Sequence, residues 1–241
     1  MDVREALAVV AGGRTLVRAE AEEVMGRIMA GEATPAQLGA LLGALHLRGE
    51  TVDEVAGFAA GLRRAAIAVQ VPAGAIDVVG TGGERSNTFN ISTVSGIVAA
   101  AAGATVAKHG NRAASSACGS ADVLEALGVC IELAPESVAA CVAETGIGFM
   151  FAPRFHPALR HAGRVRREIG IRTVFNILGP LANPAGVTRM VLGVPSAAIG
   201  ETIARVLLEL GAEHALVVHG ADGLDEISPT GPTRTWTVRG G

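Results

Sequence analysis

From Pro72 onward, short runs rich in β-branched residues alternate with stretches of helical periodicity. The runs read, in chain order, AIDVVG, TVAKHG, VCIEL, IGFMFAP, RMVLGVP and HALVVHG. Strands separated by helices of this length form sheets in which most neighbours are parallel and both faces are covered. The alternation therefore predicts an α/β domain with a mixed, mostly parallel central sheet. One more run, TRTWTV, predicts a last strand near residue 238.

The first part of the chain has a different texture and is predicted to be helical. The sequence TPAQ at residues 34–37 is a capping box with proline at the first helical position, and leucines on one helical face follow it. Thr51 and Glu54 repeat the capping box. We therefore expect a helical domain over residues 1–71 and a larger α/β domain over residues 72–241, with the boundary near Val71 to Gly74.

The stretch GTGGERSNTFNIST, residues 80–93, follows the first predicted strand and runs into an apolar helical segment. Glycines let backbone N–H groups approach a ligand closely, and a helix N-terminus adds unpaired donors and a positive dipole end. This arrangement favours a phosphorylated ligand. It is not a P-loop, because Ser86-Asn87 stands in place of Gly-Lys-Ser/Thr, and Arg85 replaces the third glycine of the dinucleotide fingerprint.

Four more polar clusters follow, most of them at the predicted carboxyl ends of strands, where ligands bind in open α/β sheets. Residues 108–122, KHGNRAASSACGSAD, offer lysine, asparagine and serine groups to a phosphate or hydroxyl. In residues 151–170 several arginines are typical of a solvated face, and residues 172–184 fit a structural turn region. Asp225 and Glu226 are candidate Mg²⁺ ligands, because Mg²⁺ prefers oxygen donors and bridges substrate phosphates.

Charge, cysteine content and polarity restrict the classes of protein to which this chain can belong. The formal net charge of −3 shows no basic excess of the kind that nucleic-acid binders carry. The three cysteines, Cys118, Cys130 and Cys141, lie among small and apolar residues and predict core thiols in a reducing cytoplasm. Early charges interrupt any signal peptide, and polar groups in the uncharged stretch 86–107 predict a buried helix rather than a membrane span. We expect a cytoplasmic protein with no nucleic-acid or membrane partner.

The motifs GTGG with FNIST, KHGNR, GSADVLEALG, FAPRFHPALR, RTVFNILGPLANP and GLDEIS, in this order and spacing, resemble the anthranilate phosphoribosyltransferase family. The resemblance runs from the N-terminal helices to Ser228. It implies transfer of the phosphoribosyl group of phosphoribosyl pyrophosphate to anthranilate, giving N-(5-phosphoribosyl)anthranilate and pyrophosphate in tryptophan biosynthesis, with Mg²⁺. It also implies a homodimer formed through the helical domain, ligands bound between the domains, and helices from about residues 157–184 that join the helical domain.

The resemblance further implies roles for individual residues. The residues implied to bind phosphoribosyl pyrophosphate are Gly80, Gly82, Gly83, Glu84, Thr88, Asn90, Ile91, Ser92, Thr93, Lys108, Ser115, Ser116 and Ser120. The residues implied to bind anthranilate are Gly80, His109, Asn111, His156 and Arg166. The implied catalytic residues are Lys108, Asn111 and Arg166, and the implied metal ligands are Ser92, Asp225 and Glu226.

Arg166 also fits its implied role by its own chemistry, since a guanidinium matches a carboxylate bidentately and anthranilate has one carboxylate. No Ser-His or Cys-His arrangement offers covalent catalysis. We therefore expect pyrophosphate to depart ahead of strong N–C bonding, through an oxocarbenium-like state that positioning and charge stabilise.

The sequence departs from the family pattern in two ways, and three alternative interpretations of its function remain open. Glu84 stands where the family commonly has Asp, and the chain is shorter than is usual in the family, which predicts an α/β domain that is incomplete at its C-terminus. The first alternative is a pyrimidine nucleoside phosphorylase-like enzyme, which shares the architecture, but its Ser-Gly-Arg motif is missing here. The second is a non-catalytic nucleic-acid-binding relative, and the third is an inactive fragment.

Overall fold

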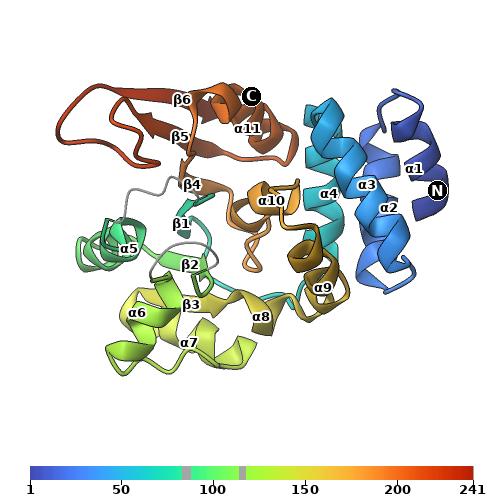
Figure 1. Ribbon diagram of the computed structural model, residues 1–241. Coiled ribbons are helices and arrows are strands. Elements are labelled where there is room, and N and C mark those ends of the chain that lie inside the picture. Colours follow the sequence, from blue (N-terminus) through green and yellow to red (C-terminus); the bar gives the residue numbers. More distant parts are fainter. Residues whose placement is uncertain (83–87, 114–117, 241) are drawn as a thin grey trace. The chain divides into compact units, whose positions relative to one another are not determined.

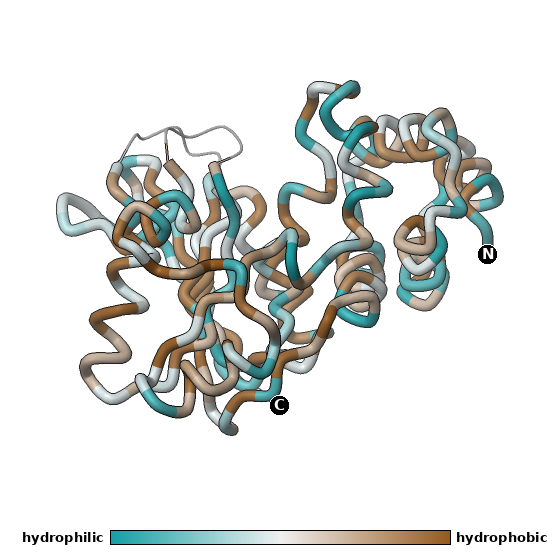
Figure 2. The backbone as a smooth tube through the Cα atoms, turned by 90° about the horizontal axis from the view of Figure 1, so that it is seen from below, coloured by the Kyte–Doolittle hydropathy of each residue, from teal (hydrophilic) through white to brown (hydrophobic). Residues whose placement is uncertain are grey.

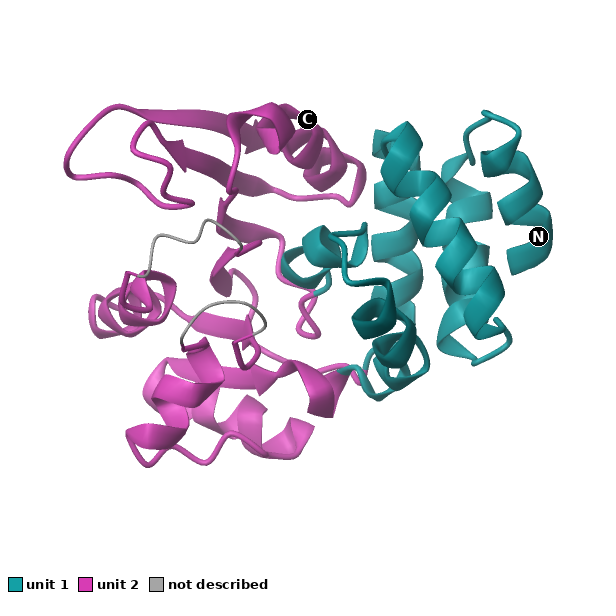
Figure 3. Ribbon diagram, in the orientation of Figure 1, with its two compact units in different colours: residues 1–66, 156–182 teal, residues 67–155, 183–241 magenta. Residues whose placement is uncertain are grey.

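The computed structural model describes three stretches of the chain (Figure 1), residues 1–82, 88–113 and 118–240. The chain forms two compact units (Figure 3). The first unit consists of residues 1–66 and 156–182, and the second of residues 67–155 and 183–241. The boundary expected near residues 71–74 falls in the segment 67–75, which has neither helix nor strand.

The first unit is helical. Its elements are α1 (Val3–Ala11), α2 (Arg18–Met29), α3 (Pro35–Arg48), α4 (Val52–Arg64), the 3-10 helix η1 (Pro157–Leu159), α9 (Arg160–Ile169) and α10 (Phe175–Leu181). The capping box of α3 is confirmed, because the Thr34 hydroxyl accepts from Gln37 N–H at 3.2 Å and the Gln37 side chain accepts from Thr34 N–H at 3.0 Å. Thr51 and Glu54 cap α4 in the same reciprocal way. Both helices therefore begin where the sequence predicts.

Helices α2 and α4 pack against each other more closely than ordinary side chains allow. A methyl group added at Gly57 would collide with the Arg18 carbonyl oxygen, and one at Gly61 would lie 2.7 Å from the Glu22 carbonyl oxygen. The N-terminal helices carry both hydrophobic and hydrophilic residues (Figure 2). In α4 the apolar residues Val55, Phe58, Ala59 and Leu62 are buried. The core of this unit thus depends on two glycines that let the helix backbones approach.

The second unit is built on a twisted sheet of strand order β3-β2-β1-β4-β5-β6, as the described residues show. The strands are β1 (Ile76–Gly80), β2 (Val106–Gly110), β3 (Ile147–Phe151), β4 (Arg189–Gly193), β5 (His214–Gly220) and β6 (Thr233–Arg239). All neighbours are parallel except β5 and β6, which are antiparallel. The predicted mixed, mostly parallel sheet is confirmed.

Helices cover this sheet. They are α5 (Ile91–Ala101), α6 (Ser120–Ala126), α7 (Pro135–Thr145), the short α8 (Ala152–Phe155) and α11 (Ala197–Glu209). Helix α5 packs on β1 and β2, α7 packs on β3, and α11 packs on β5 and β6 (Figure 1). Trp236 of β6 lies against Gly200 of α11, where a side chain larger than hydrogen would collide with the indole ring. Helix α11 thereby packs against the antiparallel edge strand β6 as well as against its neighbour β5.

One predicted strand is wrong. The run VCIEL, residues 129–133, forms a loop between α6 and α7. Only Ile131 of this run is buried, in a small apolar cluster with Leu124 and Phe151, while its neighbours Val129 and Cys130 are exposed. The run packs through a single side chain and pairs with no strand, so its β-branched composition alone was misleading.

Two predicted burials are also wrong. Cys118 and Cys130 are exposed and Cys141 is half-buried. Cys118 and Cys130 lie in loops, where small and apolar neighbours in the sequence do not determine which side chains face the core. Helix α5 is not buried all round, since it packs on the sheet with one face while Val94, Ile97 and Val98 on the other are exposed. Among the described residues, no helix has the length and apolarity needed to cross a membrane.

The close packing of α2 on α4 makes a testable prediction about the first unit. We expect Gly57→Ala to lower the free energy of unfolding by about 1–3 kcal/mol, because the added methyl group has no room against the Arg18 backbone. Gly43→Ala in α3 is the matched control, since a methyl group there meets no atom within 4 Å and alanine favours a helix by about 1 kcal/mol. Urea unfolding of the two variants should shift in opposite directions, and a shift in the same direction would contradict the packing described.

Candidate functional site

Four neighbouring parallel strands end in glycine at the same edge of the sheet. They are β2, β1, β4 and β5, which end at Gly110, Gly80, Gly193 and Gly220. Each glycine lies under a loop: a Cβ at Gly110 would collide with Ser120 Oγ, and a Cβ at Gly80 would lie 2.6 Å from Asp225 Oδ2. At the carboxyl edge of the sheet, loops therefore approach the strand backbone closely at these glycines.

Asp225 occupies the centre of this edge. Its carbonyl oxygen lies where a Cβ of Gly193 would be, and Gly193 is the register partner of Gly80. Its carboxylate accepts a hydrogen bond from Gly82 N–H at 3.3 Å, and the residue is 8% exposed. The structure thus brings an acid predicted from the sequence onto the glycine loop, with half-buried Glu226 beside it.

The donor set at this edge suits a magnesium ion by its chemistry. Asp225 and Glu226 supply carboxylate oxygens, and Ser92 supplies a hydroxyl, which are the oxygen ligands that Mg²⁺ prefers. The described residues contain no ready-made cluster of three or more His, Cys, Asp or Glu side chains. Any Mg²⁺ held here would complete its coordination with substrate phosphates or water, as this ion usually does.

Lys108 lies beneath the N-terminus of α5. It is 3% exposed, and its ammonium donates to the Val78 carbonyl oxygen at 2.6 Å and to Ser92 Oγ at 3.3 Å. Burial lowers the pKa of Lys108. The structure therefore places this predicted catalytic residue on protein groups, where it orients the first turn of α5 through Ser92.

Sequence reasoning missed two buried polar residues next to Lys108. Asp77 of β1 is 0% exposed, and its carboxylate accepts from Asn183 Nδ2 at 2.7 Å and from His109 N–H at 3.4 Å. Burial raises the pKa of Asp77 to about 6, against the lowering effect of the Lys108 charge. Asn183 also donates to the Ala107 carbonyl oxygen at 2.9 Å, so it ties β1 to β2. An acid inside the apolar run AIDVV was the available signal.

The start of α5 and the loop after β2 are joined. Asn90, at the N-cap of α5, donates from its side chain to the Cys118 carbonyl oxygen at 3.0 Å. Ile91 and Ser92 in the first turn are half-buried and Thr88 is exposed. Thr93 is 1% exposed, and its hydroxyl has no hydrogen-bond partner among the described residues. The Thr93 side chain thus faces the interior, away from the surface where a phosphate contact was expected.

The loop after β2 is closed at its base. Ser120 Oγ donates to the Asn111 carbonyl oxygen at 3.2 Å, and the Asp122 carboxylate accepts from Ala113 N–H at 3.0 Å and Gly119 N–H at 2.8 Å. These backbone bonds lower the pKa of Asp122. Four predicted site residues lie outside the described residues, namely Gly83, Glu84, Ser115 and Ser116.

Two histidines assigned to anthranilate are buried. His156, in the first unit, is 2% exposed, and its Nε2 lies 2.9 Å from the Ala182 carbonyl oxygen. Burial lowers the pKa of His156 to about 4, so the ring is neutral at pH 7. His109, in the second unit, is also buried, and its backbone N–H is the donor to Asp77.

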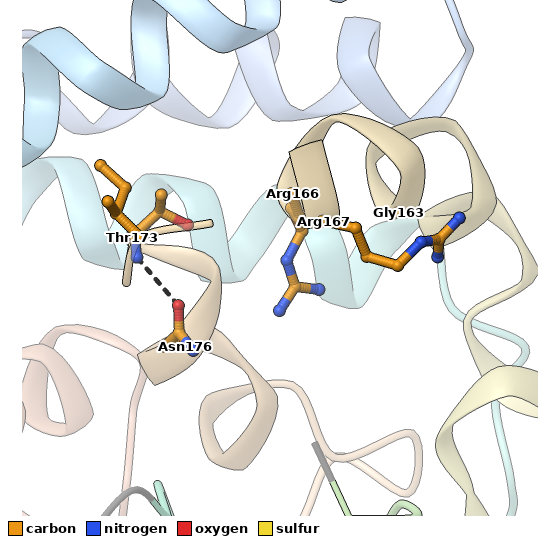
Figure 4. Close-up of a pocket in the computed structure, with 6 residues that line it drawn as sticks. Gly163, Arg166, Arg167, Thr173 and Asn176 are labelled. Carbon is orange, nitrogen blue, oxygen red and sulfur yellow. Dashed lines mark hydrogen bonds between the residues drawn. The ribbon is translucent and has the colours of Figure 1, made fainter. Parts of the chain in front are cut away.

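The first unit contains its own polar pocket of about 250 Å³, which is lined by Gly163, Arg166, Arg167, Ile171, Thr173 and Asn176. Figure 4 shows Arg166 extending from α9 into the open space, whereas Arg167 runs back along the helix toward Gly163. Asn176 accepts a hydrogen bond from Thr173 N–H at 2.8 Å, which fixes the start of α10.

Arg166 contacts an aromatic ring and has no acidic partner in the described part of the chain. Its guanidinium lies 5.0 Å from the centre of the Phe175 ring, and within the described parts of the chain no carboxylate pairs with it. Its helix neighbour Arg164 is paired with Glu168 at 2.7 Å. Burial lowers the pKa of Arg166 from its usual value, yet an arginine remains protonated at pH 7. The pocket thus presents a positive charge that is available to an anion.

Comparison with known proteins relates both units to the same protein family. Residues 4–66 match the glycosyl transferase family helical bundle domain, and residues 73–241 match the glycosyl transferase family a/b domain. The chain is 61% identical to anthranilate phosphoribosyltransferase of Chloroflexus aurantiacus and 58% identical to that of Herpetosiphon aurantiacus, over all of this chain and 71% of each relative.

Solved structures agree in fold. Anthranilate phosphoribosyltransferase from Thermus thermophilus superposes with a TM-score of 0.89 at 47% identity, covering 97% of this chain and 73% of that one. The Saccharomyces cerevisiae enzyme in complex with PRPP and Mg also has a TM-score of 0.89, at 27% identity, covering 98% of this chain and 72% of that one. With the glycine edge, the acid loop and the helical unit all found in one chain, this protein belongs to the anthranilate phosphoribosyltransferase family.

Proposed function

We propose that this chain transfers the phosphoribosyl group of phosphoribosyl pyrophosphate to the amino group of anthranilate and releases pyrophosphate, in tryptophan biosynthesis. The observation that carries the proposal is the Asp225 carboxylate lying on the Gly82 backbone at the glycine edge of the sheet. Measuring pyrophosphate release with and without anthranilate tests it. Release that does not depend on anthranilate would contradict the proposed acceptor.

The second unit binds phosphoribosyl pyrophosphate in this proposal. The glycine loop beginning at Gly80 and the N-terminus of α5 offer backbone N–H groups to phosphate oxygens. Lys108 holds Ser92 in the first turn of α5 through its hydrogen bond of 3.3 Å. Asp225, Glu226 and Ser92 would hold Mg²⁺, which supplies positive charge to the departing pyrophosphate when it is bound.

The first unit binds anthranilate in this proposal. The Arg166 guanidinium, unpaired among the described residues, receives the anthranilate carboxylate in a bidentate fashion. Ile171 and the aliphatic part of the pocket contact the ring, and Asn176 lies on the opposite side from α9 (Figure 4). Arg167 also lines the pocket, but it is exposed and its guanidinium is turned toward Gly163, so it does not bind the carboxylate in this proposal.

The chemistry follows from the weak nucleophilicity of an aromatic amine. The bond from the anomeric carbon to the pyrophosphate oxygen breaks, and the bond to the anthranilate nitrogen forms. The nitrogen loses one proton, which passes to the departing pyrophosphate or to water. Backbone donors at the glycine loop stabilise charge on the leaving group, and Arg166 restricts the approach of the amine. Positioning and electrostatics, rather than a covalent intermediate, therefore supply the rate enhancement.

We further propose that the chain works in the cytoplasm as a homodimer formed through its helical unit. Leu47 near the end of α3 is 88% exposed, and burying such a side chain against a second copy would be favourable. Sedimentation of the wild type and of a Leu47→Glu variant tests this assignment. Identical dimer dissociation constants for the two would place the contact elsewhere.

The assignment of Arg166 makes a prediction. Arg166→Ala should weaken anthranilate binding by about 1.5–3 kcal/mol, because a charged hydrogen-bonding partner of the carboxylate is lost. The affinity for phosphoribosyl pyrophosphate should not change. Arg167→Ala is the matched control on the same helix and should bind both substrates nearly as the wild type does. Titration calorimetry with each substrate measures the difference, and equal weakening of both substrates by Arg166→Ala would contradict the assignment.

The acid pair makes a second prediction. The double variant Asp225→Asn, Glu226→Gln retains side-chain size and the acceptor for Gly82 N–H but removes both charges. We expect its thermal midpoint to change little without ligand, while Mg²⁺-dependent binding of phosphoribosyl pyrophosphate falls at least tenfold. Calorimetry in Mg²⁺ and in chelator checks this. Equal binding in the two buffers, for wild type and variant alike, would exclude the metal role.

A further inference from the structure

The turn between β5 and β6 carries Asp225 and Glu226, and it begins with a third acid that the reaction does not need directly. Asp222 is exposed, a location where acids usually do no more than contact water. Its carboxylate nevertheless accepts hydrogen bonds from Ser228 Oγ at 2.5 Å and Thr230 Oγ1 at 2.9 Å. These bonds, with the Ser228 bond as the larger effect, lower the pKa of Asp222 and keep it ionised.

The side chains that donate to Asp222 are themselves fixed by hydrogen bonds. Thr230 N–H donates to Ser228 Oγ at 3.0 Å, and Ser228 N–H donates at 3.0 Å to Oγ1 of Thr233, the first residue of β6. On the other side, Asp222 Oδ1 accepts from Leu224 N–H at 3.3 Å. The carboxylate therefore joins the residues just before the acid pair to those just after it. We call this set, Asp222, Ser228, Thr230 and Thr233, the acid-loop clasp.

The acid-loop clasp packs against the end of β5. Gly220 ends β5, and a Cβ there would lie 2.5 Å from Asp222 Oδ1 and 3.2 Å from Ser228 Cβ. Gly220 N–H donates to the Leu224 carbonyl oxygen at 2.8 Å, one residue before Asp225. The loop thus has little freedom to move as a body, because its two ends and its base are all bonded.

Asp225 tolerates little displacement. Its carbonyl oxygen fills the space above Gly193 and its carboxylate the space beside Gly80, so a shifted loop would lose the bond from Gly82 N–H. Metal ligands need a defined geometry, and Mg²⁺ is strict in demanding near-octahedral coordination. An element that holds the loop would therefore act on metal binding without touching the metal.

We propose that Asp222 is a positioning residue that holds Asp225 and Glu226 in the geometry required for Mg²⁺ and phosphoribosyl pyrophosphate. This inference rests on the metal role proposed above for the acid pair. Asp222 acts through the clasp and not as a ligand, because both of its carboxylate oxygens already accept hydrogen bonds from the loop.

The test compares Asp222→Ala with Glu132→Ala, a control at an exposed acid of the same unit for which the described structure shows no hydrogen bond or ion pair. In Asp222→Ala we expect the Mg²⁺ concentration for half-maximal phosphoribosyl pyrophosphate binding to rise about tenfold. Excess Mg²⁺ should restore binding in this variant but not in Asp225→Asn. Anthranilate affinity and the thermal midpoint should match those of Glu132→Ala.

Thr230→Val removes one donor to the carboxylate and should give a smaller shift of the same sign, which keeps the inference testable if Asp222→Ala folds poorly. Unchanged Mg²⁺ dependence in Asp222→Ala, or an equal loss of both substrates, would overturn the positioning role. If the variant Asp225→Asn, Glu226→Gln also kept its Mg²⁺ dependence, the proposed metal site itself would be wrong. The two failures are thus distinguishable.

Discussion

The close approach of Asp225 to the backbone at the ends of β1 and β4 is the constraint on which the rest of the second unit depends. The approach is possible only because Gly80 and Gly193 are register partners and neither has a side chain. Parallel pairing places both ends at one edge of the sheet, and the antiparallel return through β6 brings the acid loop over that edge. Sheet topology, strand length and two missing side chains therefore act together to place one carboxylate.

Buried polar and charged side chains hold together the strands that form this edge. Asp77 and Lys108 lie on adjacent strands, are almost wholly buried and offset each other's charge, while Asn183 bonds Asp77 and β2 together. Buried polar groups of this kind are expensive unless all are hydrogen-bonded. The arrangement fixes Ser92 and the first turn of α5, so part of the interior polarity of this unit serves the phosphate-binding loop and not stability alone.

Much of the local structure could be predicted from short patterns. The capping boxes at Thr34 and Thr51 determine where two helices begin, because the same four residues contain both donors and acceptors of each cap. The run VCIEL shows the limit of this reasoning. Its composition is that of a strand, but pairing depends on a partner with free backbone groups, and the edge beside β2 is taken by β3. Likewise, apolar neighbours around Cys118 could not reveal that it is exposed.

The amino-acid sequence by itself determined the alternation of strands and helices, the glycine loop, the acid pair and the family, because these are properties of residues that are near one another in the chain. Only the tertiary structure decided that Gly193 and Gly220 belong to the site, that Lys108 bonds Ser92 and Val78, and that Asp222 closes the acid loop. Each of those facts joins residues from different strands or from the two ends of a loop. Their distances depend on strand order and register, which no local pattern specifies.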